Sequence, residues 1–119
     1  MYFVERTDVV LKPTAAFLAW LKSVDEDMPD LTLAQLRSNC TTLLVPEFET
    51  PEAVMGYIGE RSRAIFEAEV AGWEVEAEKW PQDMSAEGFW AFFEVEIHDM
   101  VLDMEDADLQ VSPVFDNMM

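Results

Sequence analysis

The sequence has few of the residues on which several classes of site depend. Cys40 is the only cysteine, so the chain can form no internal disulfide and no zinc cluster of thiolates. His98 is the only histidine, and Cys40 has no nucleophile signature around it. The four glycines form neither a GxGxxG nor a Walker sequence. These absences favour a protein that is not an enzyme, and they predict no catalytic residue and no cofactor.

Long apolar runs are also absent. No stretch reaches the roughly 20 apolar residues that span a bilayer, and Met1 leads into a strand-like pattern rather than into a secretory signal. We therefore expect a cytoplasmic protein without a membrane partner. At 119 residues, half of them apolar, the chain is long enough for one domain with its own core.

Basic residues are the scarcest charged class. The chain has 25 Asp and Glu against 7 Lys and Arg, a net charge of −18. Residues 74–119 carry 13 of the acids and a single base, Lys79. So strong a negative field repels nucleic acid and attracts basic proteins. The charge predicts a basic protein partner and no direct binding to nucleic acid, and its simplest alternative role is to keep the protein dissolved.

Three segments are predicted to form strands. Residues 2–12 are rich in Val and aromatic side chains, and their broken alternation indicates either a bulge near Thr7 and Asp8 or a strand covered on both faces. Residues 40–45 end at Pro46, and the run from Leu43 to Val45 indicates burial on both faces. In residues 94–103, apolar side chains alternate with polar ones, which is typical of a half-buried strand. The stretch 89–104 also fits helical spacing, so a helix there is the alternative, and it would make the protein mostly α.

Helices are predicted between these strands from their start signals. Residues 15–23 carry a helical stripe, and Thr32 and Gln35 have capping-box spacing. Thr50 followed by Pro51 begins a long helix that runs to about residue 73, and Ser85 caps a short helix that ends near residue 92. Glu69 falls on the apolar face of the long helix, where it is either paired in the interior or, as we favour, exposed in an uncovered last turn.

The predicted fold class is therefore α+β. A small three-stranded sheet, residues 2–12, 40–45 and 94–103, is covered by one long helix and several short ones. Residues 1–104 form the single domain, and residues 105–119 form an acidic C-terminal tail.

Several aromatic and acidic stretches run along the chain: YFVERTDVVLKP, FLAWL, LVPEF, IFEAE followed by Trp73, KWP, and FFEVEIHDMVLDM. Together they resemble a family of small acidic conserved hypothetical proteins of proteobacteria. The resemblance covers nearly the whole chain and implies a stand-alone domain. The family has no assigned chemistry, so the resemblance implies no site residue.

Two groups of residues are candidate binding sites. On the long helix, at about 100° per residue, four carboxylates fall on almost one line opposite the apolar face: Glu60, Glu67, Glu74 and Glu78. Such a row can imitate DNA phosphates to a basic protein. On the last strand, Glu94, Glu96 and His98 share one face, on which two carboxylates and an imidazole could collect a metal ion. The plain interpretation of both groups is a solvated surface.

The sequence therefore predicts a non-enzymatic acidic interaction module that binds a basic protein, with a DNA mimic or inhibitor as its sharpest form. The alternative is a small carboxylate-based metal-binding protein or enzyme. A homodimer formed through aromatic and Met side chains that the core does not need stays open.

Overall fold

Two antiparallel sheets organise the fold in the computed structural model, which describes residues 1–115. A three-stranded sheet has the order β3 (Thr41–Val45), β2 (Thr7–Pro13), β4 (Phe93–His98). A second pair joins β1 (Tyr2–Phe3) to β5 (Leu102–Asp103). With the helices described below, this arrangement confirms the predicted α+β class.

The predicted first and last strands are each interrupted. β1 and β2 come from the predicted strand 2–12, and β4 and β5 come from the predicted strand 94–103. Phe3 pairs with Leu102 and Asp8 with His98, so the first segment uses one residue more than the second between the two pairings. This extra residue is a bulge. It lies between Val4 and Arg6, where the Arg6 N–H donates to the Val4 carbonyl at 2.8 Å. The predicted position is wrong, because Thr7 and Asp8 both pair regularly within β2.

Side chains alternate between the two faces of the sheet as expected for half-buried strands. In β2 the buried positions are Thr7, Val9, Leu11 and Pro13. In β4, Phe93, Val95 and Ile97 face the core, whereas Glu94, Glu96 and His98 are exposed. The strand prediction for this segment is confirmed, and the helical alternative is wrong beyond residue 92.

The expected burial of both faces of β3 is wrong. Val45 is buried and Leu43 half-buried, but Leu44 is 49 % exposed. Leu44 pairs with Asp8, and Leu43 pairs with Val9. Leu44 therefore belongs to the open face of the sheet, because adjacent residues of a strand point to opposite faces.

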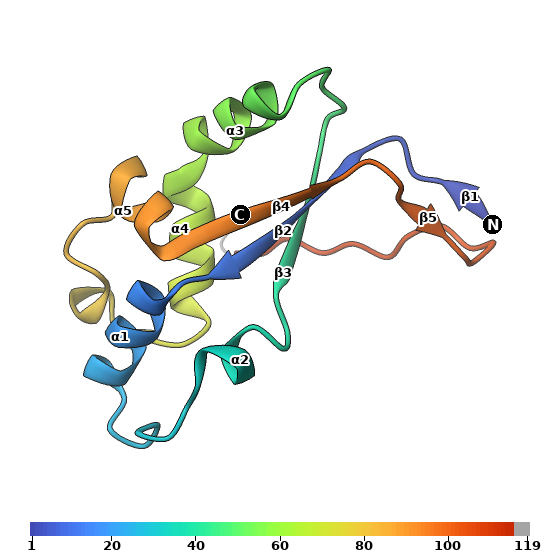
Figure 1. Ribbon diagram of the computed structural model, residues 1–119. Coiled ribbons are helices and arrows are strands. Elements are labelled where there is room, and N and C mark those ends of the chain that lie inside the picture. Colours follow the sequence, from blue (N-terminus) through green and yellow to red (C-terminus); the bar gives the residue numbers. More distant parts are fainter. Residues whose placement is uncertain (116–119) are drawn as a thin grey trace.

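The helices gather around one end of the sheet, while β1 and β5 project from the other end (Figure 1). They are α1 (Ala15–Val24), α2 (Leu33–Leu36), α3 (Pro51–Glu60), α4 (Ser62–Ala71) and α5 (Ala86–Phe92), with a short 3₁₀ helix η1 (Ala77–Lys79) between the last two.

Capping signals in the sequence place three helix starts correctly. Thr32 and Gln35 form both hydrogen bonds of a capping box at α2. The Thr50 hydroxyl accepts the Ala53 N–H at 3.2 Å, and the Ser85 hydroxyl accepts the Gly88 N–H at 3.4 Å. Each bond satisfies an N–H that the first turn of a helix leaves without a partner.

The long helix predicted from Pro51 to about residue 73 is wrong as one continuous element. It breaks at Arg61, whose backbone angles are φ −113° and ψ 11°. The Arg61 guanidinium lies 3.6 Å from the centre of the Tyr57 ring and donates to the Tyr57 carbonyl at 3.0 Å. The break lets both halves bury their apolar side chains, Ile58 in α3 and Phe66 in α4.

The core is centred on a cluster of phenylalanine rings. Phe66 of α4 lies edge-on to Phe89, Phe92 and Phe93 at centroid distances of 5.9, 5.2 and 5.9 Å. Phe17 of α1 contacts Phe93 at 5.4 Å. These contacts hold α1, α4 and α5 against the inner face of β4, since edge-to-face aromatic pairs add to the free energy of burial.

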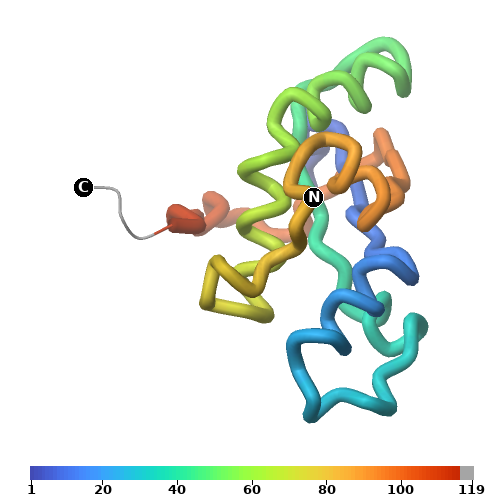
Figure 2. Tube along the Cα trace, turned by 90° about the vertical axis from the view of Figure 1, so that its left-hand side faces the viewer, coloured from blue at the N-terminus to red at the C-terminus, as the bar shows by residue number. Residues whose placement is uncertain are grey.

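Residues beyond β5 form no helix or strand as far as Phe115. Figure 2 shows this C-terminal segment, in red, emerging beside α4, in green. It is the part of the predicted acidic tail 105–119 that the structure describes, and the remaining residues, 116–119, lie outside the described part of the chain. Within residues 1–115, no helix has the length and apolar character needed to cross a bilayer.

Candidate functional site

The predicted row of four carboxylates is divided among several elements. Glu60 ends α3, Glu67 lies in α4, Glu74 follows the end of α4, and Glu78 lies in η1. The row needs one continuous helix, so the break at Arg61 and the end of α4 at Ala71 remove its geometric basis.

Two members of the predicted row are already partnered by cations. Glu60 lies 3.6 Å from Arg61, and Glu67 lies 3.3 Å from Arg63. Glu74 instead accepts the backbone N–H of Glu76 through its side chain at 3.1 Å. These contacts leave the four carboxylates in different environments rather than in a regular array.

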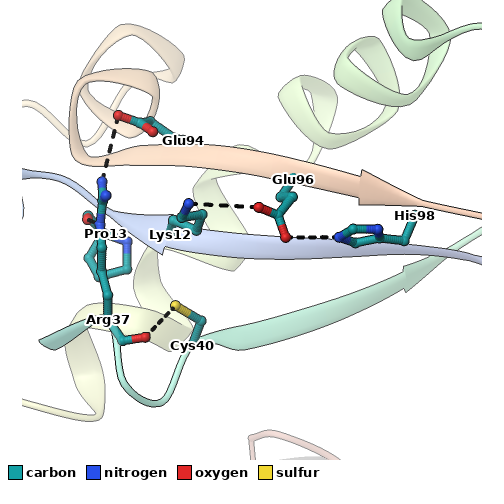
Figure 3. A network of polar contacts seen from close by, with 7 residues as sticks. All are labelled: Lys12, Pro13, Arg37, Cys40, Glu94, Glu96 and His98. Carbon is teal, nitrogen blue, oxygen red and sulfur yellow. Dashed lines mark hydrogen bonds and ion pairs between the residues drawn. The ribbon is translucent and has the colours of Figure 1, made fainter. Parts of the chain in front are cut away.

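The predicted metal ligands lie on the open face of the sheet (Figure 3). Glu96 lies between two bases, with Lys12 at 3.7 Å and the His98 ring at 2.8 Å. Glu94 turns the other way, to Arg37 at 3.6 Å. The strand thus gives the three side chains a common face, as predicted, but Glu94 is not brought to the other two.

The hydrogen bond to His98, with a further contribution from the charge of Lys12, lowers the pKa of Glu96. The Glu96 carboxylate thus forms a hydrogen bond with the His98 ring and an ion pair with Lys12. Among residues 1–115, no three His, Cys, Asp or Glu side chains converge so that they could hold a metal ion. A metal at Glu94, Glu96 and His98 stays a prediction, and elemental analysis of the purified protein would test it.

Arg37, at the end of α2, connects this network of polar contacts to the helices. The Arg37 Nε–H donates to the Pro13 carbonyl at 2.7 Å, and the Cys40 thiol donates to the Arg37 carbonyl at 3.4 Å (Figure 3). The lone cysteine therefore helps to fix the turn between α2 and β3.

A second acidic region lies at the projecting end of the molecule. Residues 99–108 contain five carboxylates and no Lys, Arg or His: Asp99, Asp103, Glu105, Asp106 and Asp108. Four of them line a hollow of 310 Å³ whose other wall is formed by Tyr2, Phe3 and Val4. Tyr2 and Phe3 are 57 % and 70 % exposed, so this hollow combines aromatic side chains with carboxylates at the surface.

A third region is an apolar groove between β3 and α4. Its lining includes Leu43, Ile65 and Ala68, and Val114 and Phe115 of the C-terminal segment lie beside them. Glu69 also borders the groove, and the Thr41 hydroxyl donates to its carboxylate at 3.0 Å.

The sequence led us to expect Glu69 to be exposed in an uncovered last turn. In the structure Glu69 is half-buried, so this expectation is wrong. Burial raises the pKa of its carboxyl, and the hydrogen bond from Thr41 opposes part of this effect.

The chain matches no family model, no curated protein and no solved structure. The resemblance to small acidic proteobacterial proteins therefore stays a prediction.

The sequence did not predict the acidic hollow or the apolar groove. Both depend on contacts between distant segments, residues 2–4 with 103–109 in one case and β3 with α4 in the other. The available signals were the run of acids from residue 99 to 108 and the position of Glu69 on an apolar helix face.

Proposed function

We propose that the chain is a non-enzymatic acidic interaction module that binds a basic protein. The observation that carries this proposal is the run of carboxylates in residues 99–108, which no base accompanies. Within residues 1–115, none of these carboxylates has a Lys, Arg or His within ion-pair distance. Their charge is therefore available to a partner, and a concentrated negative field speeds the encounter with a positive one.

The basic residues of the chain lie elsewhere and are mostly engaged. Five of the seven Lys and Arg contact carboxylates outside residues 99–108: Lys12, Arg37, Arg61, Arg63 and Lys79. Such surface pairs add little to stability, but they neutralise part of the remaining surface. Residues 25–30 also hold four carboxylates without an ion pair, so the absence of a pair alone does not distinguish residues 99–108. The exposed apolar side chains beside residues 99–108 are what support a binding surface there.

Exposed apolar side chains next to these carboxylates support a protein rather than a small cation as the partner. Phe3, Met100 and Met104 are 70 %, 71 % and 69 % exposed, and they neighbour the acidic hollow in the chain. Protein interfaces commonly have an apolar centre and a polar rim. The complementary partner has an apolar patch surrounded by Lys and Arg.

The finer form of the proposal is a cytoplasmic partner that itself binds DNA, since such proteins carry large basic surfaces. The broken helix withdraws the regular row of carboxylates as support for phosphate mimicry, so this form rests on charge density alone. Self-association through the same surface is disfavoured, because two copies would bring residues 99–108 of each against the like charge of the other.

The test is affinity capture from a lysate with the immobilised protein, at low salt and at ~0.5 M salt. The triple variant Glu105→Gln, Asp106→Asn, Asp108→Asn removes three charges from the proposed surface. The matched control, Glu26→Gln, Asp27→Asn, Asp30→Asn, removes the same number from the loop between α1 and α2. We expect basic proteins to be retained at low salt, to be released by salt or by added DNA, and to be lost only with the first variant.

Two outcomes would contradict the proposal. Retention that is unchanged at ~0.5 M salt would remove its electrostatic basis. Equal loss in both triple variants would mean that total charge, and not this surface, governs binding.

A further inference from the structure

The groove between β3 and α4 has a volume of 400 Å³ and is bordered almost entirely by apolar side chains. Ala64 and Ala68 stand one turn apart on α4, and their small side chains leave space between the helix and the strand. Leu43 and Ile65, both half-buried, form its apolar sides together with Val114 and Phe115 of the C-terminal segment. A groove of this composition suits a short hydrocarbon chain, because burial of each methylene is favourable.

Among the residues that the structure describes, Glu69 is the only one with a charged side chain that borders the groove. Its Oε2 accepts the Thr41 hydroxyl at 3.0 Å, and no Lys, Arg or His within residues 1–115 lies within ion-pair distance of its carboxylate. An ionised carboxylate that is partly removed from water gains from a cation beside it. The groove therefore combines a surface for methylenes with one uncompensated negative charge.

We propose that this groove binds a lysine side chain of a basic protein partner. The methylenes lie along Leu43, Ile65 and Ala68, and the ammonium group contacts Glu69. The source of the lysine, a protein partner, rests on the function proposed above. The preference of the groove for an alkylammonium group is independent of that function.

Lysine suits the groove better than arginine. Thr41 occupies one oxygen of the Glu69 carboxylate, so a paired, two-bond contact with a guanidinium group would have to compete with the hydroxyl. The ammonium of lysine is a compact charge at the end of a four-carbon stem and needs only one oxygen.

The probe is n-butylammonium, which is the lysine side chain without its backbone. Binding is followed through amide chemical shifts in the full chain, with n-butanol as the chain without the charge and methylammonium as the charge without the chain. We expect n-butylammonium to shift the amides of residues 41–43 and 64–69, with a dissociation constant on the order of millimolar. Neither comparison compound should match this affinity.

Two variants test the two halves of the site. Glu69→Gln removes the charge and should weaken n-butylammonium binding about tenfold, since hydrogen bonds to charged groups contribute more than neutral ones. Glu60→Gln is the matched control: it removes one exposed carboxylate from the end of α3 and should leave binding unchanged. Ala68→Leu fills the groove while keeping Glu69, and it should also abolish binding.

Several results would overturn the assignment. These are equal binding of n-butanol and n-butylammonium, equal loss in Glu69→Gln and Glu60→Gln, and shifts confined to residues 99–108. Chemical shifts of the groove amides that change with protein concentration and not with amine concentration would identify a second copy of the chain as the occupant, and would also overturn the assignment. Failed amine binding with intact capture of basic proteins would overturn the groove alone. Amine binding without capture would overturn the proposed function and leave the groove as an amine site.

Discussion

Two glycines in helices allow the packing of the fold to be tested with the same substitution. A Cβ atom at Gly88 in α5 would lie 2.0 Å from the backbone oxygen of Asp83 and 2.9 Å from its carbonyl carbon. A Cβ atom at Gly56 in α3 would have no neighbour within 4 Å. Gly88→Ala and Gly56→Ala should therefore change stability in opposite directions.

The magnitude for Gly88→Ala follows from what the new methyl group displaces. The Asp83 carboxylate accepts the N–H of Ser85 at 3.0 Å and also its hydroxyl, and the Ser85 hydroxyl caps α5. Met84, which lies between them, is buried. Overpacking costs about 1–3 kcal/mol and a lost cap about 1 kcal/mol, and the better helix propensity of alanine returns about 1 kcal/mol. The net expectation is a loss of about 1–3 kcal/mol.

Gly56→Ala should instead gain about 0.5–1 kcal/mol, because Gly56 is exposed in a helix interior and alanine restricts the unfolded chain. The free energies of unfolding are measured by urea titration, with an unchanged m-value as the check that both variants unfold from the same native state. If Gly88→Ala were as stable as Gly56→Ala, the close approach of Asp83 to α5 would be refuted.

Two further predictions concern the core and Glu69. Phe66→Ala should lower the free energy of unfolding by about 3–5 kcal/mol, because Phe66 is fully buried among three other rings, whereas Phe3→Ala, at a position 70 % exposed, should change it by less than about 0.5 kcal/mol. A small effect of Phe66→Ala in the same urea titration would contradict the aromatic cluster. The stability of Glu69→Gln relative to the original protein should increase as pH rises. The raised pKa of Glu69 means that its ionised carboxylate destabilises the folded state. This destabilisation is absent near ~pH 4 and complete above the raised pKa. Urea titrations at ~pH 4 and pH 7 measure this difference, and a gain that shrinks with rising pH would show that Glu69 is stabilised in its charged form.

Local signals were sufficient to predict much of the fold. The caps at Thr32, Thr50 and Ser85 are made by side chains within three residues of the bond they form, so the sequence contains both partners. The alternation in residues 93–98 likewise depends only on the two-residue period of a strand. The α+β class follows once these elements are placed.

The features that could not be predicted depend on distant contacts. Gly59 stands two residues before Arg61, but Gly56 lies inside α3 without breaking it, so glycine alone does not mark the break between α3 and α4. The break is favoured by the burial of Ile58 and Phe66 against one core. The burial of Leu44 could not be judged before Asp8 was known to pair with it. For Glu69, its helical position indicated an apolar environment, but only the approach of Thr41 from β3 explains how its carboxylate is accommodated.

The single extra residue between Phe3 and Asp8 affects how much strand edge the molecule presents to other chains. Without it, β1 with β2 and β4 with β5 would form one long, regular ladder whose outer edge carries exposed aromatic and Met side chains, the kind of edge on which further chains can stack. By breaking the ladder, the bulge limits the outermost pair to two residues on each strand. The apolar end of the molecule therefore offers only a short row of backbone groups to a further strand.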